Sequence, residues 1–362
     1  MPNLRLIAAA DPEWNQWIES TSHDVYHTAA YHQVVTFEGD GTPQLLVYGS
    51  PGRFVAWPYL LIPIPGSIEA IGSPAFDATS VYGYSGPIVH GCEPEDPLIL
   101  EAWAAFQSVW LDQQIVSVFT RFHPILRNHR WFTGVGVSDP RDDPPRGLVL
   151  TGETVSIDLR KPDAEIVAAY PRVLRQEIAA NKRKGLVTEL DRDWRHLETF
   201  IDLYAETMRR NQAQSAYFLR REYFTELIDA LGEDAILFVT RSGPDVVAAC
   251  LFLSHHGILH PHLAGTSTPF LGMSPLKVMW DEVRRWAAGR GDRVMHLGGG
   301  RGGTSDSLLS FKSRFSPDRH PFYTGRWIME DQHYETLARR SRDEGASESG
   351  YFPIYRAPRS LE

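Results

Sequence analysis

Cysteine is nearly absent from this chain, and its scarcity excludes two kinds of site. The 362 residues include only Cys92 and Cys250, which lie far apart and have no partner at ligand spacing. This excludes a disulfide framework and a cysteine-based zinc site. The sequence also lacks an apolar leader and any run of about eighteen apolar residues. We therefore expect a cytoplasmic protein without a transmembrane segment.

An excess of positive charge is missing as well. Lys and Arg total 36 against 45 Asp and Glu, which gives a formal net charge of −9. Any contact with a nucleic acid must therefore use a local basic patch. Core material, in contrast, is plentiful, because 43% of the residues are hydrophobic and the chain has 17 Phe, 14 Tyr and 10 Trp. The length suggests about two globular domains.

Several common catalytic motifs are also missing. The sequence contains no GxxxxGK[ST], no GxSxG and no HExxH, which argues against a P-loop enzyme, a nucleophile-elbow hydrolase and a zinc protease. Four histidines lie close together, but no carboxylate or cysteine accompanies them at ligand spacing. We therefore expect no metal at His255, His256, His260 and His262.

The order of the predicted elements occurs twice. Strand, helices, strands, helix and strand follow one another before residue 150 and again after it, which predicts an α/β (α+β) protein with two tandem domains. We place these domains at residues 1–150 and 151–325, and a last strand, helix and tail at 326–362. Pro58, Pro63 and Pro65 predict that the strand at residues 54–64 either lies at a sheet edge or is bounded at its end. Residues 163–184 are predicted to form one helix.

One stretch, residues 294–317, combines a buried strand, a glycine loop and a short helix. The strand ends at Gly298, Gly299 and Gly300, and Lys312 lies among the apolar residues of the amphipathic turn that follows. Glycines let backbone N–H groups approach an anion, and a lysine adds a mobile charge. The stretch is either a site for an anionic ligand or a glycine-rich connection beside a solvated lysine.

The densest basic patch lies at the end of the predicted helix 163–184. It either binds the phosphates of RNA or a nucleotide, or is a solvated helix face. Arg209 and Arg210 close the next predicted helix, where cations favour the C-terminal dipole and where an arginine can also clamp a diphosphate. The patch consists of Arg172, Arg175, Lys182, Arg183 and Lys184.

Segments between residues 170 and 316, taken in order, resemble the FemABX family of aminoacyl-tRNA-dependent transferases and related FemAB-like proteins of the acetyltransferase (GNAT) fold. Two weaker matches, YGYSGP at 82–87 and FTRFHP at 119–124, lie before residue 150. The stronger matches are LRQEI (174–178), NKRKGL (181–186), FIDLYAETMRRN (200–211), HLAGTS (262–267), the helix 280–291, HLGG (296–299) and FKSRF (311–315).

The resemblance implies two tandem GNAT-like domains around a central cleft, with the end of the chain packing back on the first domain. The helical coiled-coil arm of some family members has no counterpart here. Lys312 would stabilise the reacting acyl group or a phosphate, and Arg210 would grip an acceptor phosphate or carboxylate. His262 and His123 stand where the family commonly has a tyrosine and an acidic residue.

We therefore expect an aminoacyltransferase that joins an amino acid from aminoacyl-tRNA to an amine, in cell-wall or secondary-metabolite (peptide antibiotic) synthesis. The acceptor would be a small molecule or a peptidoglycan precursor. No cofactor other than this co-substrate is expected, and we expect a monomer. The expected catalytic residues are Lys312, His262 and His123; the substrate-binding residues are Arg210, Arg121, Tyr84, Tyr217, Gly299 and Gly300; and the tRNA-binding residues are Arg172, Arg175, Lys182, Arg183 and Lys184.

Three other functions remain open at this point. The first is an acyl-CoA-dependent N-acyltransferase on the same fold, although residues 270–275 lack the Q/R-x-x-G-x-G/A sequence that cradles the CoA pyrophosphate in such enzymes. The second is a FemAB-like binding module without catalysis. The third is an enzyme that binds a nucleotide or sugar phosphate at the glycine loop.

Overall fold

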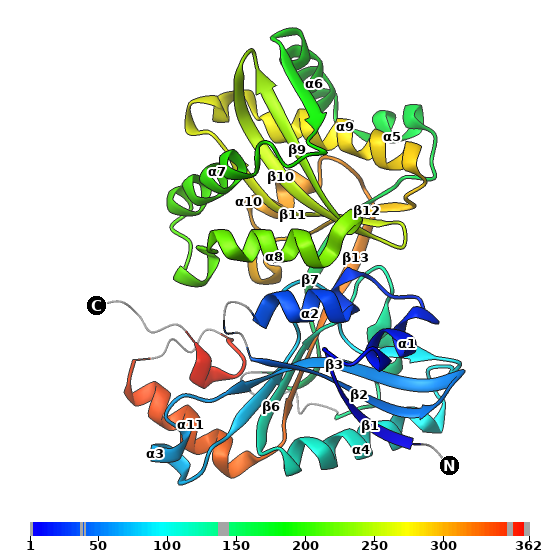
Figure 1. Cartoon of the computed structure of the whole chain (residues 1–362), viewed down its shortest axis with the longest axis vertical. Coiled ribbons are helices and arrows are strands. Elements are labelled where there is room, and N and C mark those ends of the chain that lie inside the picture. Colours follow the sequence, from blue (N-terminus) through cyan, green and yellow to red (C-terminus); the bar gives the residue numbers. More distant parts are fainter. Residues whose placement is uncertain (1–2, 37–38, 40, 137–144, 346–349, 358–362) are drawn as a thin grey trace. The chain divides into compact units, whose positions relative to one another are not determined.

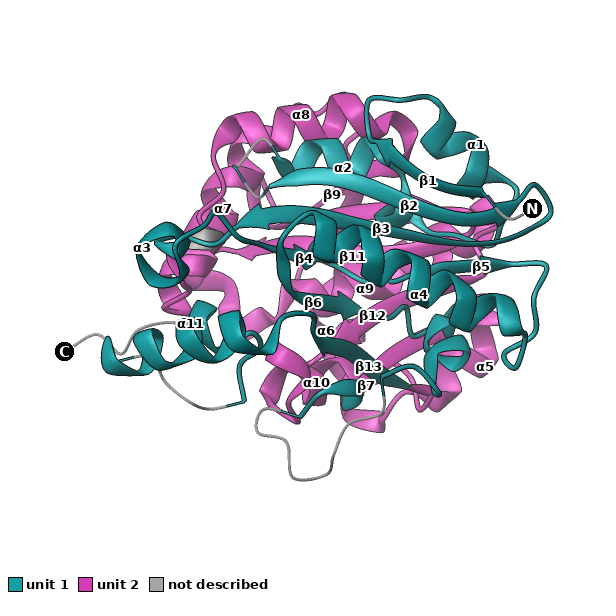
Figure 2. Ribbon diagram, turned by 90° about the horizontal axis from the view of Figure 1, so that it is seen from below, with its two compact units in different colours: residues 1–151, 321–362 teal, residues 152–320 magenta. Residues whose placement is uncertain are grey.

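The chain folds into two compact units, each a mixed sheet covered by helices (Figures 1 and 2). The computed structural model describes residues 3–36, 39, 41–136, 145–345 and 350–357. Unit 1 comprises residues 1–151 and 321–362, and unit 2 comprises residues 152–320. The C-terminal helix α11 (Asp331–Asp343) belongs to unit 1.

The two sheets have the same topology. In unit 1 the strand order is β1 (Asn3–Ala8), β2 (Thr42–Ser50), β3 (Arg53–Pro63), β4 (Phe76–Thr79), β6 (Ile115–Arg121) and β13 (Arg319–Ile328), and β5 (Ile88–His90) also pairs with β3. In unit 2 it is β8 (Leu186–Leu190), β9 (Ala235–Ser242), β10 (Asp245–His255), β11 (Ile258–Thr266), β12 (Val294–Gly299) and β7 (Gly147–Asp158).

Each sheet has four antiparallel strands, one parallel pair and a final antiparallel strand. The parallel pairs are β4 with β6 and β11 with β12. The last strand of the first sheet, β13, comes after unit 2 in the chain and pairs with β6, whereas β7 lies at the start of unit 2 and pairs with β12. This arrangement is a tandem pair of GNAT-like α/β folds.

Aromatic residues fill the core of unit 1. Side chains alternate along β3, so Trp57 faces helix α4 (Pro97–Asp112) while Phe54 faces helix α1 (Glu13–Glu19). Trp57 packs against Trp103 and Trp110 of α4, with ring centroids 5.7 and 5.3 Å apart. Helices α2 (Ala29–Thr36) and α3 (Ser67–Ile71) complete the helices of this unit.

In unit 2, helices cover both faces of the sheet (Figure 1). Helix α7 (Leu197–Arg210) lies on β10 and β11, while α9 (Pro275–Arg290) packs on β8, β9 and β10 from the other face. The apolar stripe of α9 includes Val278, Met279 and Val283, all of which are buried. The remaining helices are α5 (Asp163–Ala169), α6 (Arg172–Arg183), α8 (Arg221–Leu231) and α10 (Ser307–Lys312).

One prediction about elements is wrong, and one of two alternatives is excluded in another. The predicted helix 163–184 is broken between α5 and α6, because Pro171 has no N–H and holds Tyr170 in the extended region (ψ 138°). The strand predicted to be either an edge strand or bounded at its end is β3, which ends at Pro63 and is not an edge strand, since it lies between β2 and the pair β4 and β5. Pro58 is tolerated there because β5 pairs only with residues 54–56 and β4 only with residues 60–63.

Candidate active site

The side chain of Lys312 is fixed on the backbone at the end of β12. Its Nζ donates a hydrogen bond of 2.6 Å to the carbonyl oxygen of Gly299. The flanking Phe311 and Phe315 pack on Trp280 of α9, with ring centroids 5.1 and 5.3 Å apart. These ring contacts hold the short helix α10, so the half-buried ammonium group has a defined position.

The surroundings of Lys312 make its ammonium group easier to deprotonate. Burial lowers the pKa of Lys312 from 10.5 to about 8, and the negative charge of Asp306 opposes this lowering. The group is therefore mostly protonated at pH 7. An ammonium has three N–H donors, and only one of them has an acceptor among the described residues. Two donors are thus left for a ligand.

The glycines of the loop are required by close backbone contacts. A Cβ on Gly299 would lie 2.7 Å from the carbonyl oxygen of Glu153, and a Cβ on Gly300 would lie 1.9 Å from that of Thr304. Both distances are too short for any larger residue. Substrate binding by Gly299 and Gly300 stays a prediction, because packing alone already requires glycine at these positions.

The glycine loop closes on a carboxylate of the chain itself. Asp306 is the N-cap of α10, and its Oδ1 accepts a hydrogen bond from the N–H of Leu309 at 2.9 Å. Its Oδ2 accepts from the N–H of Arg301 at 3.2 Å. Burial raises the pKa of Asp306, but these backbone N–H groups outweigh burial and leave the pKa below its ordinary value. Asp306 therefore remains charged at neutral pH.

The parallel strands of unit 2 pair over a short distance only. β11 pairs with β12 at Ile258–Val294 and at Leu259–Met295, although both strands continue beyond these pairs. Among the described residues, the ladder between β11 and β12 ends at that point.

The equivalent strands of unit 1 are joined over their length. β4 pairs with β6 along Phe76–Thr79, and the N–H of Ser80 continues the ladder to the carbonyl oxygen of Phe119. The start of the following helix is also occupied, because the carboxylate of Asp96 accepts a hydrogen bond from the N–H of Leu98 at 2.9 Å. Helix α9 of unit 2 begins without a side-chain cap.

Arg210 connects helix α7 to the end of β11. Its Nη1 donates to the carbonyl oxygen of Thr266 and to Oγ1 of Thr268, and its Nη2 donates to Oγ1 of Thr207, each at 3.1 Å. Arg210 therefore has a structural role in this arrangement, and its grip on an acceptor stays a prediction.

Tyr217 lies in the turn that follows helix α7. Its carbonyl oxygen accepts a hydrogen bond from the hydroxyl of Tyr204 at 2.9 Å. The residue is 43% exposed, and the neighbouring Phe218 is 41% exposed. The structure gives Tyr217 an accessible position in unit 2 but does not bring it to Lys312 in any described contact.

His262 lies on β11 of unit 2. Burial, and secondarily His260, lower its pKa from 6.5 to about 3. The imidazole is therefore neutral at physiological pH but weakly basic, which makes it a poor match for proton transfer near pH 7. The role of His262 as a general base stays a prediction.

In unit 1, His123 forms a fully buried pair with Asp24. Its Nε2 lies 2.8 Å from Oδ2 of Asp24, and its Nδ1 accepts a hydrogen bond from the N–H of Leu126 at 3.1 Å. The tautomer inferred from these contacts has its proton on Nε2. The structure brings Tyr84 close to His123, with ring centroids 6.4 Å apart. A base role for His123 requires this arrangement to open.

Arg121, the other predicted substrate residue of unit 1, is the last residue of β6. Its guanidinium lies 4.9 Å from the ring centroid of Phe119, and its backbone N–H donates to Oγ of Ser80.

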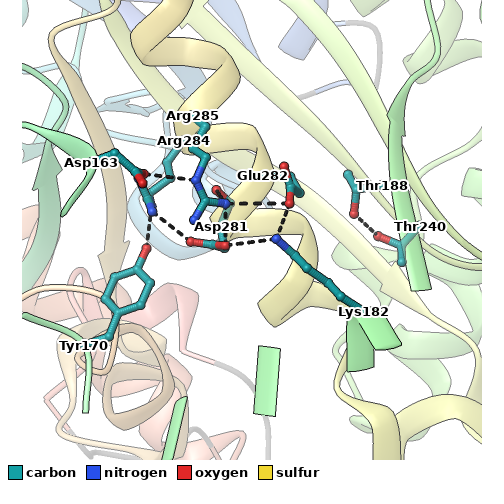
Figure 3. Close-up of polar contacts among 9 residues, drawn as sticks. All are labelled: Asp163, Tyr170, Lys182, Thr188, Thr240, Asp281, Glu282, Arg284 and Arg285. Carbon is teal, nitrogen blue, oxygen red and sulfur yellow. Dashed lines mark hydrogen bonds and ion pairs between the residues drawn. The ribbon is translucent and has the colours of Figure 1, made fainter. Parts of the chain in front are cut away.

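The predicted tRNA-binding residues divide into two groups. Lys182 forms ion pairs with Asp281, at 3.4 Å, and with Glu282 (Figure 3). The other four side chains are exposed and have neither a hydrogen bond nor an ion pair within the described ranges; they are Arg172, Arg175, Arg183 and Lys184.

Lys182 belongs to a polar network that the sequence analysis missed (Figure 3). At its centre, Arg284 is 1% exposed and donates to the hydroxyl of Tyr170 and to Asp163, both at 2.6 Å. Arg284 and Arg285 also bind Asp281, at 2.9 and 2.6 Å. The network therefore holds α5, α6 and α9 together. The spacing of three and four residues within α9 is a sequence signal for these last pairs.

Asp306 was also missed as a site residue, although a signal was present. An aspartate directly before an amphipathic turn is typical of an N-cap. The structure places it between the glycine loop and the helix that carries Lys312.

Comparisons with known proteins agree with this architecture. A family model described as an acetyltransferase (GNAT) domain matches residues 170–306. No curated protein matches the sequence. No helix in the described ranges is both long and apolar enough to cross a membrane.

Solved structures show the same fold at low sequence identity. FemX is 12% identical, with a TM-score of 0.68 over 92% of this chain and 99% of its own. The C-terminal domain of a candidate lysylphosphatidylglycerol synthetase from Agrobacterium fabrum is 15% identical, with a TM-score of 0.55 over 92% and 95%. A tandem GNAT protein from the clavulanic acid biosynthesis pathway is 13% identical, with a TM-score of 0.50 over 90% and 98%.

Proposed function

We propose that this chain, whose tandem GNAT-like units have the fold of FemX, is an acyltransferase that uses aminoacyl-tRNA. It would join the carried amino acid to an amine of a small molecule or a peptidoglycan precursor. The observation that carries this proposal is the position of Lys312, which is fixed on Gly299 with two N–H donors left for a ligand.

The chemistry required of the protein is modest, because an aminoacyl ester is already activated. The acceptor amine attacks the ester carbonyl, and negative charge develops on the carbonyl oxygen. An ammonium fixed beside that oxygen stabilises the charge in the transition state. The amine nitrogen loses a proton, and the ester oxygen of the tRNA ribose leaves with one. Positioning the two substrates supplies the rest of the rate.

Three features of unit 2 favour it as the donor-binding unit. Its parallel strands separate after two residue pairs, and its helix α9 starts without a side-chain cap. Positive charge is also concentrated there, since all five lysines of the chain lie between residues 161 and 312. The exposed arginines of α6, Arg172 and Arg175, would contact the RNA backbone.

Two neighbours guide the choice of the acyl group. One is named as a lysylphosphatidylglycerol synthetase, and the product in this name is an amino acid, lysine, attached to an acceptor. FemX has the higher TM-score of the two. Amino-acid transfer is therefore our first proposal. We propose His262 or His123 as the protein base that takes the proton from the amine.

An acyl-CoA-dependent N-acyltransferase is the second candidate. The match of residues 170–306 to an acetyltransferase domain favours it. The sequence at the start of α9, residues 270–275, contains Gly272 but lacks the Q/R-x-x-G-x-G/A sequence that usually approaches the CoA pyrophosphate. For this reason we place acyl-CoA after aminoacyl-tRNA.

A binding experiment separates the two donors. The protein would be titrated by calorimetry with acetyl-CoA and with tRNA that carries its amino acid through a hydrolysis-resistant amide. We expect micromolar or tighter binding of the RNA and no measurable binding of acetyl-CoA. Micromolar acetyl-CoA binding without RNA binding would overturn the proposal and favour the second candidate.

A further inference from the structure

We infer that Asp306 is a positioning residue for Lys312: its carboxylate fixes the glycine loop and the helix that carry the lysine, and its negative charge acts on the ammonium. The catalytic consequence of this inference rests on the proposed function. The structural and electrostatic part stands on the contacts of the chain itself.

The geometry of the loop is the first argument. Asp306 receives the N–H of Arg301 from one side of the loop and the N–H of Leu309 from helix α10. A Cβ on Gly300 would lie 2.6 Å from Oδ1 of Asp306, so glycine is what lets the carboxylate approach this closely. The carboxylate therefore sits between the end of β12, which accepts the lysine, and the helix that carries it.

The second argument is the short path between the two charged residues. Lys312 is the last residue of α10, and Asp306 is the N-cap of the same helix. The Nζ of Lys312 returns to Gly299, which immediately precedes Gly300 in the loop that Asp306 closes. The glycine loop and helix α10 therefore both link the carboxylate of Asp306 to the ammonium group of Lys312.

The third argument is the pairing of the other charges on the elements around α10. These charges have partners of opposite sign. Arg301 of the glycine loop adds a positive charge that acts on Asp306 and lowers its pKa. Asp306, in contrast, accepts only backbone N–H groups among the described contacts. The other pairs are Glu177 with Lys277 and Arg314, Glu153 with Arg319, and Asp281 with Arg284.

The sign of the effect follows from these charges. A nearby negative charge favours the charged form of a lysine and raises its pKa, against the lowering caused by burial. Removing the charge of Asp306 must therefore lower the pKa of Lys312 below about 8. The ammonium would then lose its proton closer to neutral pH.

The test is an Asp306→Asn variant, because asparagine remains a good N-cap but has no charge. The five lysines of the chain, labelled with ¹³C and ¹⁵N at the ε position, would be titrated by NMR. We expect the Lys312 midpoint to fall by roughly 0.3–1 pH unit relative to the wild type. The other lysines, which are Lys161, Lys182, Lys184 and Lys277, serve as internal references.

A matched control is Asp96→Asn, which makes the same change at the cap of α4 in unit 1. It should leave the Lys312 midpoint unchanged. If Asp306→Asn fails to fold, Asp306→Ser provides a second uncharged cap. An unchanged Lys312 midpoint in a folded Asp306 variant overturns the inference.

The catalytic part has a separate readout. If the proposed function is right, the alkaline limb of the pH–rate profile moves to lower pH in Asp306→Asn together with the NMR midpoint. A shifted midpoint without any aminoacyl transfer, in variant and wild type alike, supports the link between Asp306 and Lys312 and counts against the proposed function only.

Discussion

Lys312 is the residue on which the proposed chemistry depends. It is the last residue of helix α10, between Phe311 and Phe315 in the sequence, and its Nζ reaches Gly299 at the end of the strand. Replacing this lysine with methionine keeps most of the packed stem and removes the charge. The variant therefore separates the role of the ammonium from that of the side chain's volume.

We expect Lys312→Met to reduce aminoacyl transfer about a hundredfold or more, the scale for the loss of one oxyanion donor. Thermal unfolding should change little, because the buried ammonium costs desolvation that methionine avoids. Lys312→Arg should restore little activity, since a planar guanidinium does not replace a point charge. Steady-state kinetics and melting curves measure both effects.

A Lys312→Met variant with wild-type turnover would remove Lys312 from the mechanism. The Lys182→Met variant is a useful comparison, since it removes a lysine from the ion pairs with α9. That change should affect stability more than turnover.

At the residue scale, the sequence was informative where chemistry and spacing coincide. A lysine between two phenylalanines and after a glycine loop is unusual, and this pattern indicates Lys312 as a candidate site residue. The sequence could not show that Gly300 is required by Asp306 and Thr304, because contacts across a loop depend on its closed shape. It also could not show that Arg210 is already engaged by three threonines.

Helix α9 shows how elements are held in unit 2. Alongside its apolar stripe, it buries Asp281 and Arg284, which are 2% and 1% exposed. Buried charges are tolerated only when they are paired and hydrogen-bonded. Asp163 and Tyr170 provide those bonds from α5 and from the residues that connect α5 to α6 (Figure 3).

We expect Arg284→Met to lower the free energy of unfolding by about 3 kcal/mol, because it removes the hydrogen bonds of Arg284 to Tyr170 and Asp163 and leaves the buried Asp281 with Arg285 and Lys182 alone. The control is Arg160→Met, which removes an ion pair to Asp158 whose arginine side chain is 71% exposed. That control should have little effect. Urea unfolding measures both variants, and equal stability of the two would show that the network contributes little.

At the element scale, long periodic segments could be predicted and interruptions could not. Apolar residues recur at helical spacing between residues 93 and 114, and this pattern predicts helix α4. The break at Pro171 was missed because the charge pattern continues through it. The interior position of β3 was missed because the local sequence does not reveal that β4 and β5 leave a gap opposite Pro58.

For the whole molecule, the distribution of charge is uneven. The chain has a net charge of −9, yet its five lysines all lie in unit 2. Helix α6 adds Arg172, Arg175 and Arg183 on one exposed side. If RNA binds, this local surface is where its phosphates would meet positive charge without displacing an existing ion pair.

We expect the double variant Arg172→Glu/Arg175→Glu to weaken binding of aminoacyl-tRNA and to lower the slope of log affinity against log salt by about 2. The matched control is Arg192→Glu/Arg195→Glu, which reverses two exposed arginines elsewhere in unit 2. Filter binding at several salt concentrations measures the slopes. Equal slopes in the two double variants would remove α6 from the RNA surface.

The tandem architecture could be predicted because the element order occurs twice and because motifs between residues 170 and 316 resemble one family. Structural neighbours confirm the GNAT-like fold and its likeness to FemX. The pairing of β13 with β6 could not be predicted, since strand partners far apart in sequence leave no local pattern. The donor, the acceptor and the catalytic base remain proposals.

The central claim is amide formation from aminoacyl-tRNA, and transfer itself is the most direct measurement. A mixture of tRNAs charged with ¹⁴C-labelled amino acids would be incubated with the protein and a small-molecule extract that supplies primary amines. Parallel reactions would contain Lys312→Met or labelled acetyl-CoA. With the wild type and aminoacyl-tRNA, we expect the label to appear in an alkali-stable amide. With Lys312→Met, we expect at least about a hundredfold less labelled amide. Transfer from acetyl-CoA, with none from aminoacyl-tRNA, would contradict the central claim.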